Sequence, residues 1–353
     1  MEMGIVYNNN GRFFMEYDKR QLLMDAFALK ETPRVPCGFW HHFVLGRDQF
    51  IADKDPALQQ KIVDGHRAYY KLVRPDMMKM MNEGFFGYPP IMDNDLRTGK
   101  DLLKIRAIGA DHPWVTDQVK HVQRIIDQFD GEVMTFYNMF SPLQNIRIRF
   151  DFLDLEYDRF VQLAEQYPEE LAAAGEEMKK DYLALVQRLF EETSLDGIYF
   201  CVQNVQSPMY TKELYDRILG PSERAVLNLA NQYSNYNILH ICGYAHHTND
   251  MNYYLDYEAG CYNWAVHTEG LSIAEGRKLF PGKCILGGFD NNPGTLIDTG
   301  TREELRDYTG RLIAENGYKG YILGADCSIP NLIDDRRVRD ITDAARTFPN
   351  PAF

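Results

Sequence analysis

The segment TREELRDYTGRLIAENGYKGYILGADC, residues 301–327, decides the fold class of this chain. Its first part, over 301–316, has helical periodicity. One face of that part is apolar and carries Leu305, Tyr308, Leu312 and Ile313. The pair Asn316-Gly317 ends the helix, and the following GYILGADC is apolar on both faces, as a buried strand of a parallel sheet is. The segment is therefore a helix followed by a buried strand, which is the repeating unit of α/β proteins.

Runs of the same character as GYILGADC recur along the whole chain. The other seven cover residues 35–43, 77–83, 133–140, 197–203, 238–243, 261–266 and 284–290. Eight strands that alternate with helices predict a parallel sheet covered by helices, and the count favours a closed (β/α)8 TIM barrel over an open doubly wound sheet. No Gly-x-Gly-x-x-Gly follows an early strand and no Walker loop is present, so the usual nucleotide-binding motifs are lacking.

The chain is predicted to form one domain over residues 1–353, with residues 1–30 as a helical N-terminal lead-in. A length of 353 residues suits a single α/β barrel, and 45% apolar residues suffice for a full core. The segment 151–194 is longer than one crossover helix needs, so we expect two helices there that break near Pro168. No internal repeat or low-complexity linker divides the chain.

Charge and composition exclude several classes of protein. The net charge is −13 and no basic run occurs, which argues against nucleic acid and anionic membranes as partners. The N-terminus lacks the pattern of a signal peptide, and no apolar stretch is long enough to span a bilayer. Six cysteines lie far apart in apolar sequence, a pattern typical of reduced cytosolic thiols or metal ligands. We therefore expect a cytoplasmic protein.

Polar side chains gather where the predicted strands end, which is where the reacting groups of TIM barrels lie. In chain order these are Trp40, His41, His42, Asn82, Glu83, Tyr137, Asn138, Ser141, Gln203, Asn204, His240, Cys242, Asp290, Asn291, Asp326 and Cys327. A barrel with a purely structural role does not require such a set. We therefore expect a functional site at this end.

His240 and Cys242 are the strongest candidates for metal ligands. They lie two apart on a predicted strand, so both side chains project from the same face. If that face is the barrel interior, imidazole and thiolate converge on one point, where Cys327 from the eighth strand can supply a third ligand. Three N/S ligands with one open position describe a catalytic zinc site. The alternative is ordinary strand sequence, since free cysteine is among the most often buried residues.

The other histidines and cysteines receive a plainer interpretation. Four cysteines near strand starts or in mid-strand are expected to be buried core thiols; they are Cys37, Cys201, Cys261 and Cys284. His246 and His247 follow the fifth strand and are expected in a solvated loop. One of His41 and His42 is expected to face the barrel interior and to contact substrate, because neighbours on a strand point to opposite faces.

The chain resembles the uroporphyrinogen decarboxylase superfamily, whose members are (β/α)8 barrels. The similarity runs from RVPCGFWHHF to GADCSIP and is strongest in VMTFYNMFSPLQ and in CILGGFDNNPGTLIDTGTREEL. ILHICG together with GADC resembles the zinc-binding branch, the corrinoid-dependent methyltransferases with the pattern His-x-Cys…Cys. On this resemblance His240, Cys242 and Cys327 match the three zinc ligands.

The chain departs from the true decarboxylases at three places. Those enzymes carry an Arg-Gln-Ala-Gly-Arg type segment after the first strand, where this chain reads FWHHFVLGR. They have a histidine near the position of Cys327, and an aspartate at the second-strand end, where this chain offers Asn82 and Glu83. These differences favour the methyltransferase branch.

The resemblance implies a zinc-dependent methyltransferase that moves a methyl group between a methylcorrinoid and a thiol or folate acceptor. The implied cofactors are bound Zn²⁺ and a corrinoid, on a partner protein or as free cobamide, and the implied partners also include a small-molecule methyl acceptor. A homodimer is suggested by relatives alone. Glu83 and Tyr137 are the candidate catalytic residues. The candidate substrate-binding residues are His41, His42, Asn138, Gln203, Asn204 and Asp290.

Two other functions stay open from the sequence. One is a metal-free decarboxylase of porphyrinogens, which would release carbon dioxide and need a cationic mouth. The other is a non-catalytic barrel that binds a corrinoid or another small ligand without turnover.

Overall fold

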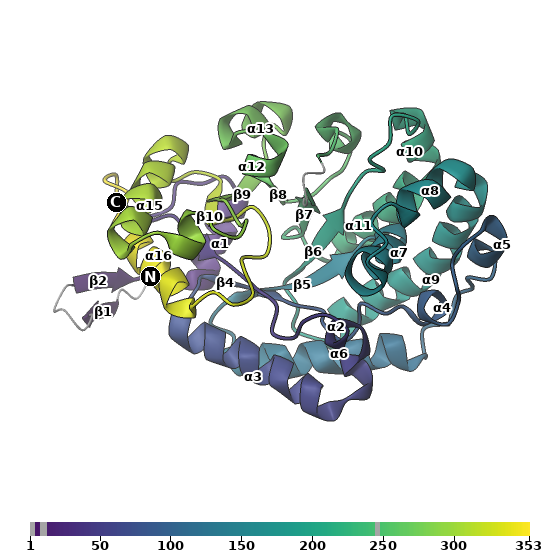
Figure 1. Cartoon of the computed structure of the whole chain (residues 1–353). Coiled ribbons are helices and arrows are strands. Elements are labelled where there is room, and N and C mark those ends of the chain that lie inside the picture. Colours follow the sequence, from purple (N-terminus) through teal and green to yellow (C-terminus); the bar gives the residue numbers. More distant parts are fainter. Residues whose placement is uncertain (1–3, 8–12, 244–247) are drawn as a thin grey trace.

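The computed structural model describes residues 4–7, 13–243 and 248–353. Eight parallel strands form one sheet that curls into a nearly closed barrel, with helices around it (Figure 1). The strands are β3 (Cys37–Gly38), β4 (Met77–Met80), β5 (Met134–Phe140), β6 (Gly197–Val202), β7 (Ile238–Ile241), β8 (Cys261–Trp264), β9 (Cys284–Phe289) and β10 (Tyr321–Ala325). Each lies within one of the eight predicted runs, so the predicted (β/α)8 barrel is confirmed.

The strand order shows how the barrel closes. Neighbours run β3-β10-β9-β8-β7-β6-β5-β4, all in parallel. The two end strands, β3 and β4, approach each other, and the backbone N–H of Asp76 donates to the carbonyl of Cys37 at 2.9 Å. In this order β7 and β10 are separated by two strands, so their ends meet only across the mouth of the barrel.

Helices form the outer layer. They are α1 (Lys19–Phe27), α2 (Asp48–Ile51), α3 (Pro56–Val73), α4 (Pro89–Met92), α5 (Gly99–Leu102), α6 (Pro113–Ile126), α7 (Pro142–Ile148), α8 (Arg159–Gln166), α9 (Pro168–Glu192), α10 (Lys212–Ile218), α11 (Gly220–Tyr233), α12 (Val266–Glu269), α13 (Ile273–Leu279), α14 (Leu296–Thr299), α15 (Arg302–Asn316) and α16 (Asp335–Ala345). The break predicted near Pro168 is confirmed, since α8 and α9 meet there. No helix of the described residues has the length and apolar character needed to cross a membrane.

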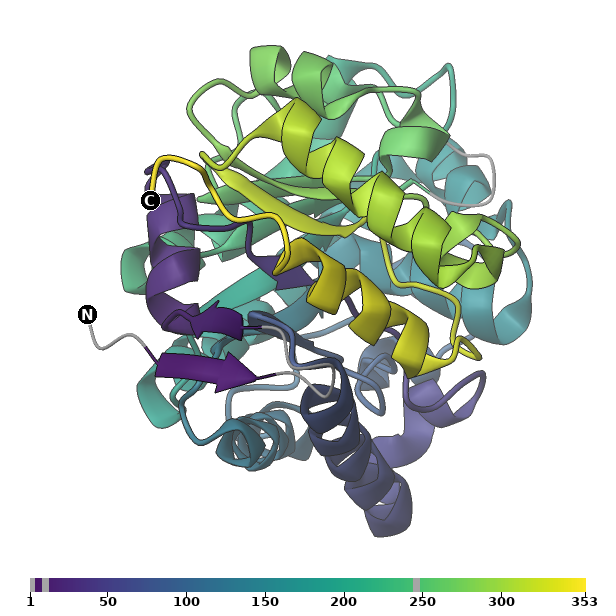
Figure 2. The same ribbon diagram turned by 90° about the vertical axis from the view of Figure 1, so that its left-hand side faces the viewer.

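Helix α15 is the one from which the fold class was read. The Thr301 hydroxyl accepts a hydrogen bond from the backbone N–H of Glu304, and the Glu304 carboxylate accepts one from the backbone N–H of Thr301 in return. The helix ends before Gly317, whose φ of 71° lies in the region that favours glycine. Leu305, Leu312 and Ile313 are buried against the barrel, and α16 packs alongside (Figure 2).

The N-terminal lead-in closes one end of the barrel. An antiparallel pair, β1 (Gly4–Tyr7) and β2 (Phe13–Glu16), precedes α1 and lies outside the barrel (Figure 2). Leu23 and Ala26 of α1 are fully buried against the barrel interior at the amino ends of the strands, here called the lower end. Side chains such as Met77 and Phe136 line this part of the interior. Because this end is filled by α1, access to the interior is through the opposite end, where the strands terminate.

Candidate functional site

His240, Cys242 and Cys327 lie together at the carboxyl ends of the strands. His240 is in β7, Cys242 follows that strand, and Cys327 follows β10. Their ligand atoms all lie within 4.8 Å of one another, and Cys327 Sγ is 3.4 Å from His240 Nε2. The strand ends that carry them therefore do meet across the barrel mouth.

Backbone hydrogen bonds fix the position of Cys242. Its N–H donates to the carbonyl of Val202 in β6 at 2.9 Å, which extends the sheet by one residue. Its carbonyl accepts a hydrogen bond from Asn249 Nδ2 at 2.9 Å. Asn249 is held by the Glu269 carboxylate through its side chain at 2.6 Å and its backbone N–H at 2.7 Å. The backbone of Cys242 is thus held through both its N–H and its carbonyl.

The segment that carries Cys327 is held from the other side. The backbone N–H of Asp326 donates to Phe289 in β9, and the buried Asp326 carboxylate lies 2.8 Å from both the backbone N and ring Nδ1 of His267. Two residues beyond the cysteine, the N–H of Ile329 donates to the carbonyl of Trp40. These contacts tie the end of β10 to the ends of β3, β9 and β8.

The trio fits a zinc ion in donor chemistry, and His240 and Cys327 fit it in spacing. One imidazole nitrogen and two sulfurs are the ligands that zinc prefers. Tetrahedral zinc places such ligand atoms roughly 3.6 Å apart, given the usual zinc–ligand bond lengths, and the 3.4 Å between Cys327 Sγ and His240 Nε2 is close to that. His240 is buried, and its Nδ1 has no partner among the described residues.

The two thiols are electrostatically unequal. A hydrogen bond from the Cys242 thiol, together with the nearby His240 imidazole, lowers the pKa of Cys327 well below its usual range against the effect of burial. The same contact and burial raise the pKa of Cys242. A cation bound between the two sulfurs would displace protons from them.

A cavity of about 490 Å³ opens above the trio. Its floor includes His240, Cys242 and Cys327 together with Lys79 and Cys201. Polar side chains from other strand ends and loops also face it; these are His42, Gln49, Asn138, Gln144, Arg147, Asp151, Gln203, Asn291, Ser328 and Asn331. A partly apolar pocket with convergent polar groups at this end of a barrel is the usual form of a small-molecule site.

One wall of the cavity is formed by α7 and the π-helix Arg149–Asp154, which carry Arg147 and Asp151. Irregular helical turns of this type occur often at functional sites. Arg147 donates to the carbonyl of Asn204 at 3.0 Å and to Gln206 Oε1 at 2.7 Å, and its Nε lies 3.7 Å from an Asp151 oxygen. Burial raises the pKa of Asp151 to about 6, against the opposing effect of Arg147.

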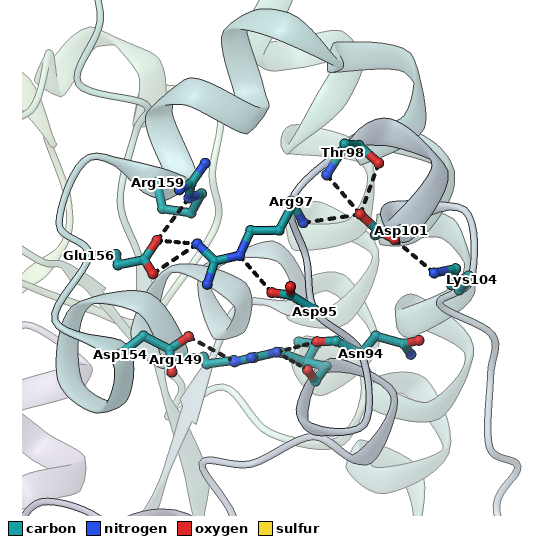
Figure 3. A network of polar contacts seen from close by, with 11 residues as sticks. Asn94, Asp95, Arg97, Thr98, Asp101, Lys104, Arg149, Asp154, Glu156 and Arg159 are labelled. Carbon is teal, nitrogen blue, oxygen red and sulfur yellow. Dashed lines mark hydrogen bonds and ion pairs between the residues drawn. The ribbon is translucent and has the colours of Figure 1, made fainter.

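The outer side of this wall is tied to the loop after β4 by a polar network (Figure 3). The Arg97 guanidinium donates to both carboxylate oxygens of Glu156, at 2.8 and 2.6 Å. Arg159 donates to the same carboxylate at 2.9 Å. Arg149 donates to the carbonyl of Asn94 at 2.6 Å. The network holds the cavity wall in place from the solvent side and takes no part in the cavity itself.

His42 and Glu83 form a pair at the cavity. His42 lines the cavity, and its Nδ1 lies 2.9 Å from Glu83 Oε1. The same oxygen accepts the backbone N–H of Phe43 at 2.8 Å. Glu83 is fully buried and does not line the cavity, so its contact with the site runs through His42.

The neighbouring strands contribute amide side chains. Asn138 lines the cavity and donates to Asn82 Oδ1 at 2.5 Å. Gln203 also lines it, and neither its amide nitrogen nor its amide oxygen has a partner among the described residues. Asn204 lies beside the cavity, where its backbone accepts from Arg147 and its N–H donates to Asn249.

Three predicted site residues lie away from the cavity. Tyr137 faces the helix layer, where its hydroxyl donates to Gln118 Oε1 at 2.7 Å. His41 is 2.8 Å from Asp335 Oδ1 and packs on Tyr69. Asp290 accepts from the backbone and side chain of Asn292. His246 and His247 lie outside the described residues.

Lys79, Arg147 and Cys201 are among the cavity residues that sequence reasoning overlooked. Lys79 was passed over within the apolar run MMKMMNE, although a lysine inside a buried strand is itself a signal. Arg147 lies just beyond a strand end, in a helix with no visible motif. Cys201 is a buried thiol, as expected for all four remaining cysteines, but it also lines the cavity.

Comparison with known families matches residues 73–348 to the family described as uroporphyrinogen decarboxylase (URO-D). The match covers well over half of the chain. The protein therefore belongs to the uroporphyrinogen decarboxylase family. No curated protein sequence matches it.

Solved structures share the fold at low sequence identity. A methyltransferase from Methanosarcina mazei has a TM-score of 0.68 and 15% identity, with 94% of this chain and 99% of that chain covered. A B12-independent methionine synthase from Shewanella sp. W3-18-1 has a TM-score of 0.52 and 13% identity, with 89% and 96% covered. A GH5_18 protein from Streptomyces cattleya has a TM-score of 0.53 and 11% identity, with 91% and 83% covered. These likenesses establish the barrel fold.

Proposed function

We propose that this protein is a zinc-dependent methyltransferase that moves a methyl group between a methylcorrinoid and a thiol or folate acceptor. The observation that carries the proposal is the convergence of His240, Cys242 and Cys327 within 4.8 Å on the floor of a cavity. The match to the uroporphyrinogen decarboxylase family and the likeness in fold to a methyltransferase support it.

The three ligands would hold zinc and leave one position open toward the cavity. A zinc ion there supplies Lewis acidity, which lowers the pKa of an acceptor group that binds at the open position. The amides of Gln203 and Asn138 offer hydrogen bonds to the rest of the acceptor. His42, held by Glu83, presents its imidazole to the same space.

The size of the cavity indicates where the methyl acceptor and the methylcorrinoid would each bind. A volume of about 490 Å³ suits a small acceptor. A corrinoid is a far larger macrocycle, so it would present its methyl group at the cavity mouth, either as free cobamide or on a partner protein. The cavity walls would then keep water away from the acceptor during transfer.

The test is metal analysis joined to a transfer assay. We expect close to one zinc per chain in freshly purified protein, and demethylation of methylcobalamin in the presence of a thiol or a folate. Removal of the metal with a chelator should abolish transfer, and added zinc should restore it. Protein that contains no zinc and binds none would contradict the proposal.

Membership of the uroporphyrinogen decarboxylase family keeps a second function testable. Release of carbon dioxide from uroporphyrinogen by the metal-free protein would favour decarboxylation. Of the described residues, Arg147 is the one arginine that lines the cavity, and it faces Asp151. A substrate with many carboxylates would therefore find few free cations here, which is why we place methyl transfer first.

A further inference from the structure

Lys79 is a buried lysine with no carboxylate paired to it among the described residues. It lies in β4 with 4% of its surface exposed, and it lines the cavity floor beside the thiols. Its ammonium lies over the rings of Trp40 and Tyr199, 4.8 and 3.9 Å from their centroids. Among the described residues it has neither a hydrogen-bond acceptor nor an ion-pair partner.

The aromatic faces compensate the burial of this charge only in part. Burial lowers the pKa of Lys79, and negative charge on the sulfurs of Cys201, Cys327 and Cys242 acts in the opposite direction. The Glu83 carboxylate also raises the pKa of Lys79, but no hydrogen bond or ion pair joins the two residues. A buried ammonium without an anion is costly, and a zinc ion would take up the negative charge of the neighbouring thiolates. An anion that arrives with a ligand would then balance Lys79.

The charges of the proposed metal site lead to the same conclusion. A zinc ion with two thiolates and a neutral imidazole has no net charge. A neutral ligand at the open position leaves the site neutral and Lys79 unbalanced. An anionic ligand gives the site one negative charge, which the ammonium of Lys79 neutralises in a poorly hydrated space, where such an interaction is strong.

We propose that Lys79 determines specificity at this site, by favouring an acceptor that binds as an anion over one that binds through a neutral nitrogen. This inference rests on the proposed function. It favours a thiol acceptor, bound as thiolate, over the neutral amine of a folate. No bond to Lys79 forms or breaks in this role, which the side chain performs through its positive charge.

Cobalt-substituted protein allows both kinds of ligand to be measured at one pH. Co²⁺ replaces zinc in such sites, and its absorption reports what binds at the open position. The probes are 2-mercaptoethanol, which binds as a thiolate, and imidazole, which binds as a neutral ligand. The variants are Lys79→Met and, as a second form, Lys79→Gln. Lys19→Met is the matched control, because Lys19 is a partly buried lysine in α1 that contacts Tyr70 at the opposite end of the barrel.

We expect Lys79→Met to weaken 2-mercaptoethanol binding about tenfold or more, since one full charge is removed beside the bound anion. Imidazole binding should change less than about twofold, and the melting temperature should stay equal or rise, because methionine suits a buried site better than an unpaired ammonium. Lys19→Met should leave both affinities unchanged.

Equal effects on both probes, or none, would overturn the role of Lys79 while leaving the metal site intact. Failure of both Lys79 variants to fold would also overturn it, because the ammonium would then be a structural requirement. A wild-type protein that binds neither zinc nor cobalt would instead contradict the proposed function itself.

Discussion

The two ends of the barrel differ in how completely their buried polar groups are paired. At the amino end of the strands, Arg34 and Asp76 form a buried pair through two hydrogen bonds of 2.7 Å, and the Asp76 carboxylate also accepts the backbone N–H of Cys37 at 2.9 Å. At the carboxyl end, Lys79 and the amide of Gln203 are buried without partners among the described residues.

The difference separates stability from function. A buried polar group that finds all its partners inside the protein contributes to a unique fold, whereas one without partners costs free energy. Natural barrels keep such unsatisfied groups at the carboxyl ends of the strands, where ligands bind. The amino end of the strands therefore supports the fold. At the carboxyl end, a bound ligand would supply the missing partners of the buried polar groups.

The cysteines follow the same division. Cys261 and Cys284 are fully buried in the lower interior, where burial raises the pKa of Cys261 well above its usual range. Cys242 and Cys327 are partly exposed, face the cavity and lie beside an imidazole. Position along the barrel, and not residue type, decides which thiols are available to a metal.

The largest expected effect is on metal binding. Cys242→Ala and Cys327→Ala should each lower zinc affinity by more than about 100-fold, since loss of a direct ligand should exceed the 10- to 100-fold effect of losing an outer partner. Zinc content and competition with a chelator measure this. Cys284→Ala is the control at the other end of the barrel and should keep its zinc. Equal loss in all three variants would show that the two ends do not differ in this respect.

The next largest effect is on stability. Asp76→Asn should lower the free energy of unfolding by about 3–5 kcal/mol, because it leaves the Arg34 charge buried and unpaired. Urea denaturation measures the loss, and zinc content of the folded protein should stay unchanged. A loss below about 1 kcal/mol would mean that the lower end does not depend on this pair.

The same pair predicts a pH dependence. Burial alone would raise the pKa of Asp76, but Arg34 lowers it to about 2, below the value of about 4 in an unfolded chain. A lowered pKa stabilises the fold above the unfolded value, and this contribution is lost as the pH falls from about 4 to about 2. In Asp76→Asn the unfolding free energy should fall less steeply over that range than in the wild type.

A smaller effect is expected at the boundary of the cavity. Glu83→Ala should cost about 2 kcal/mol of stability, because the N–H of Phe43 and the ring of His42 lose their acceptor. Glu83→Gln keeps an oxygen acceptor and should lose less than half as much. Thermal unfolding compares the two, and zinc content should be normal in both. Loss of zinc in Glu83→Gln would place the carboxylate closer to the metal than proposed.

The smallest effect is expected on the outer wall. Glu156→Gln weakens the network in Figure 3, where Arg97 and Arg159 share the carboxylate. Exposed ion pairs contribute little, so the unfolding free energy should change by less than about 1 kcal/mol. Zinc content and the affinity for 2-mercaptoethanol should not change. A clear loss of ligand affinity would show that the wall must be rigid for the cavity to bind.

The sequence predicted the barrel well because its signals are local. Eight apolar runs, the amphipathic segment over 301–316 and the break at Pro168 each follow from residues close together in the chain. The side-chain period of two also placed His240 and Cys242 on one face of β7. For Tyr137 and Asn138 the same period could not say which one faces inward, because strands of a parallel barrel are apolar on both faces. The structure turns Asn138 to the cavity and Tyr137 to the helices.

By itself, the sequence determined the strand and helix order and the residue types available at each strand end. Only the tertiary structure decided that the ends of β7 and β10 meet, because these strands are not neighbours in the sheet and come together by closure of the barrel. It also decided that Lys79 lines the cavity without an ion-pair partner among the described residues, since burial and pairing depend on side chains from distant strands. A chemical site of this kind is a property of the closed barrel, whereas its parts are properties of the chain.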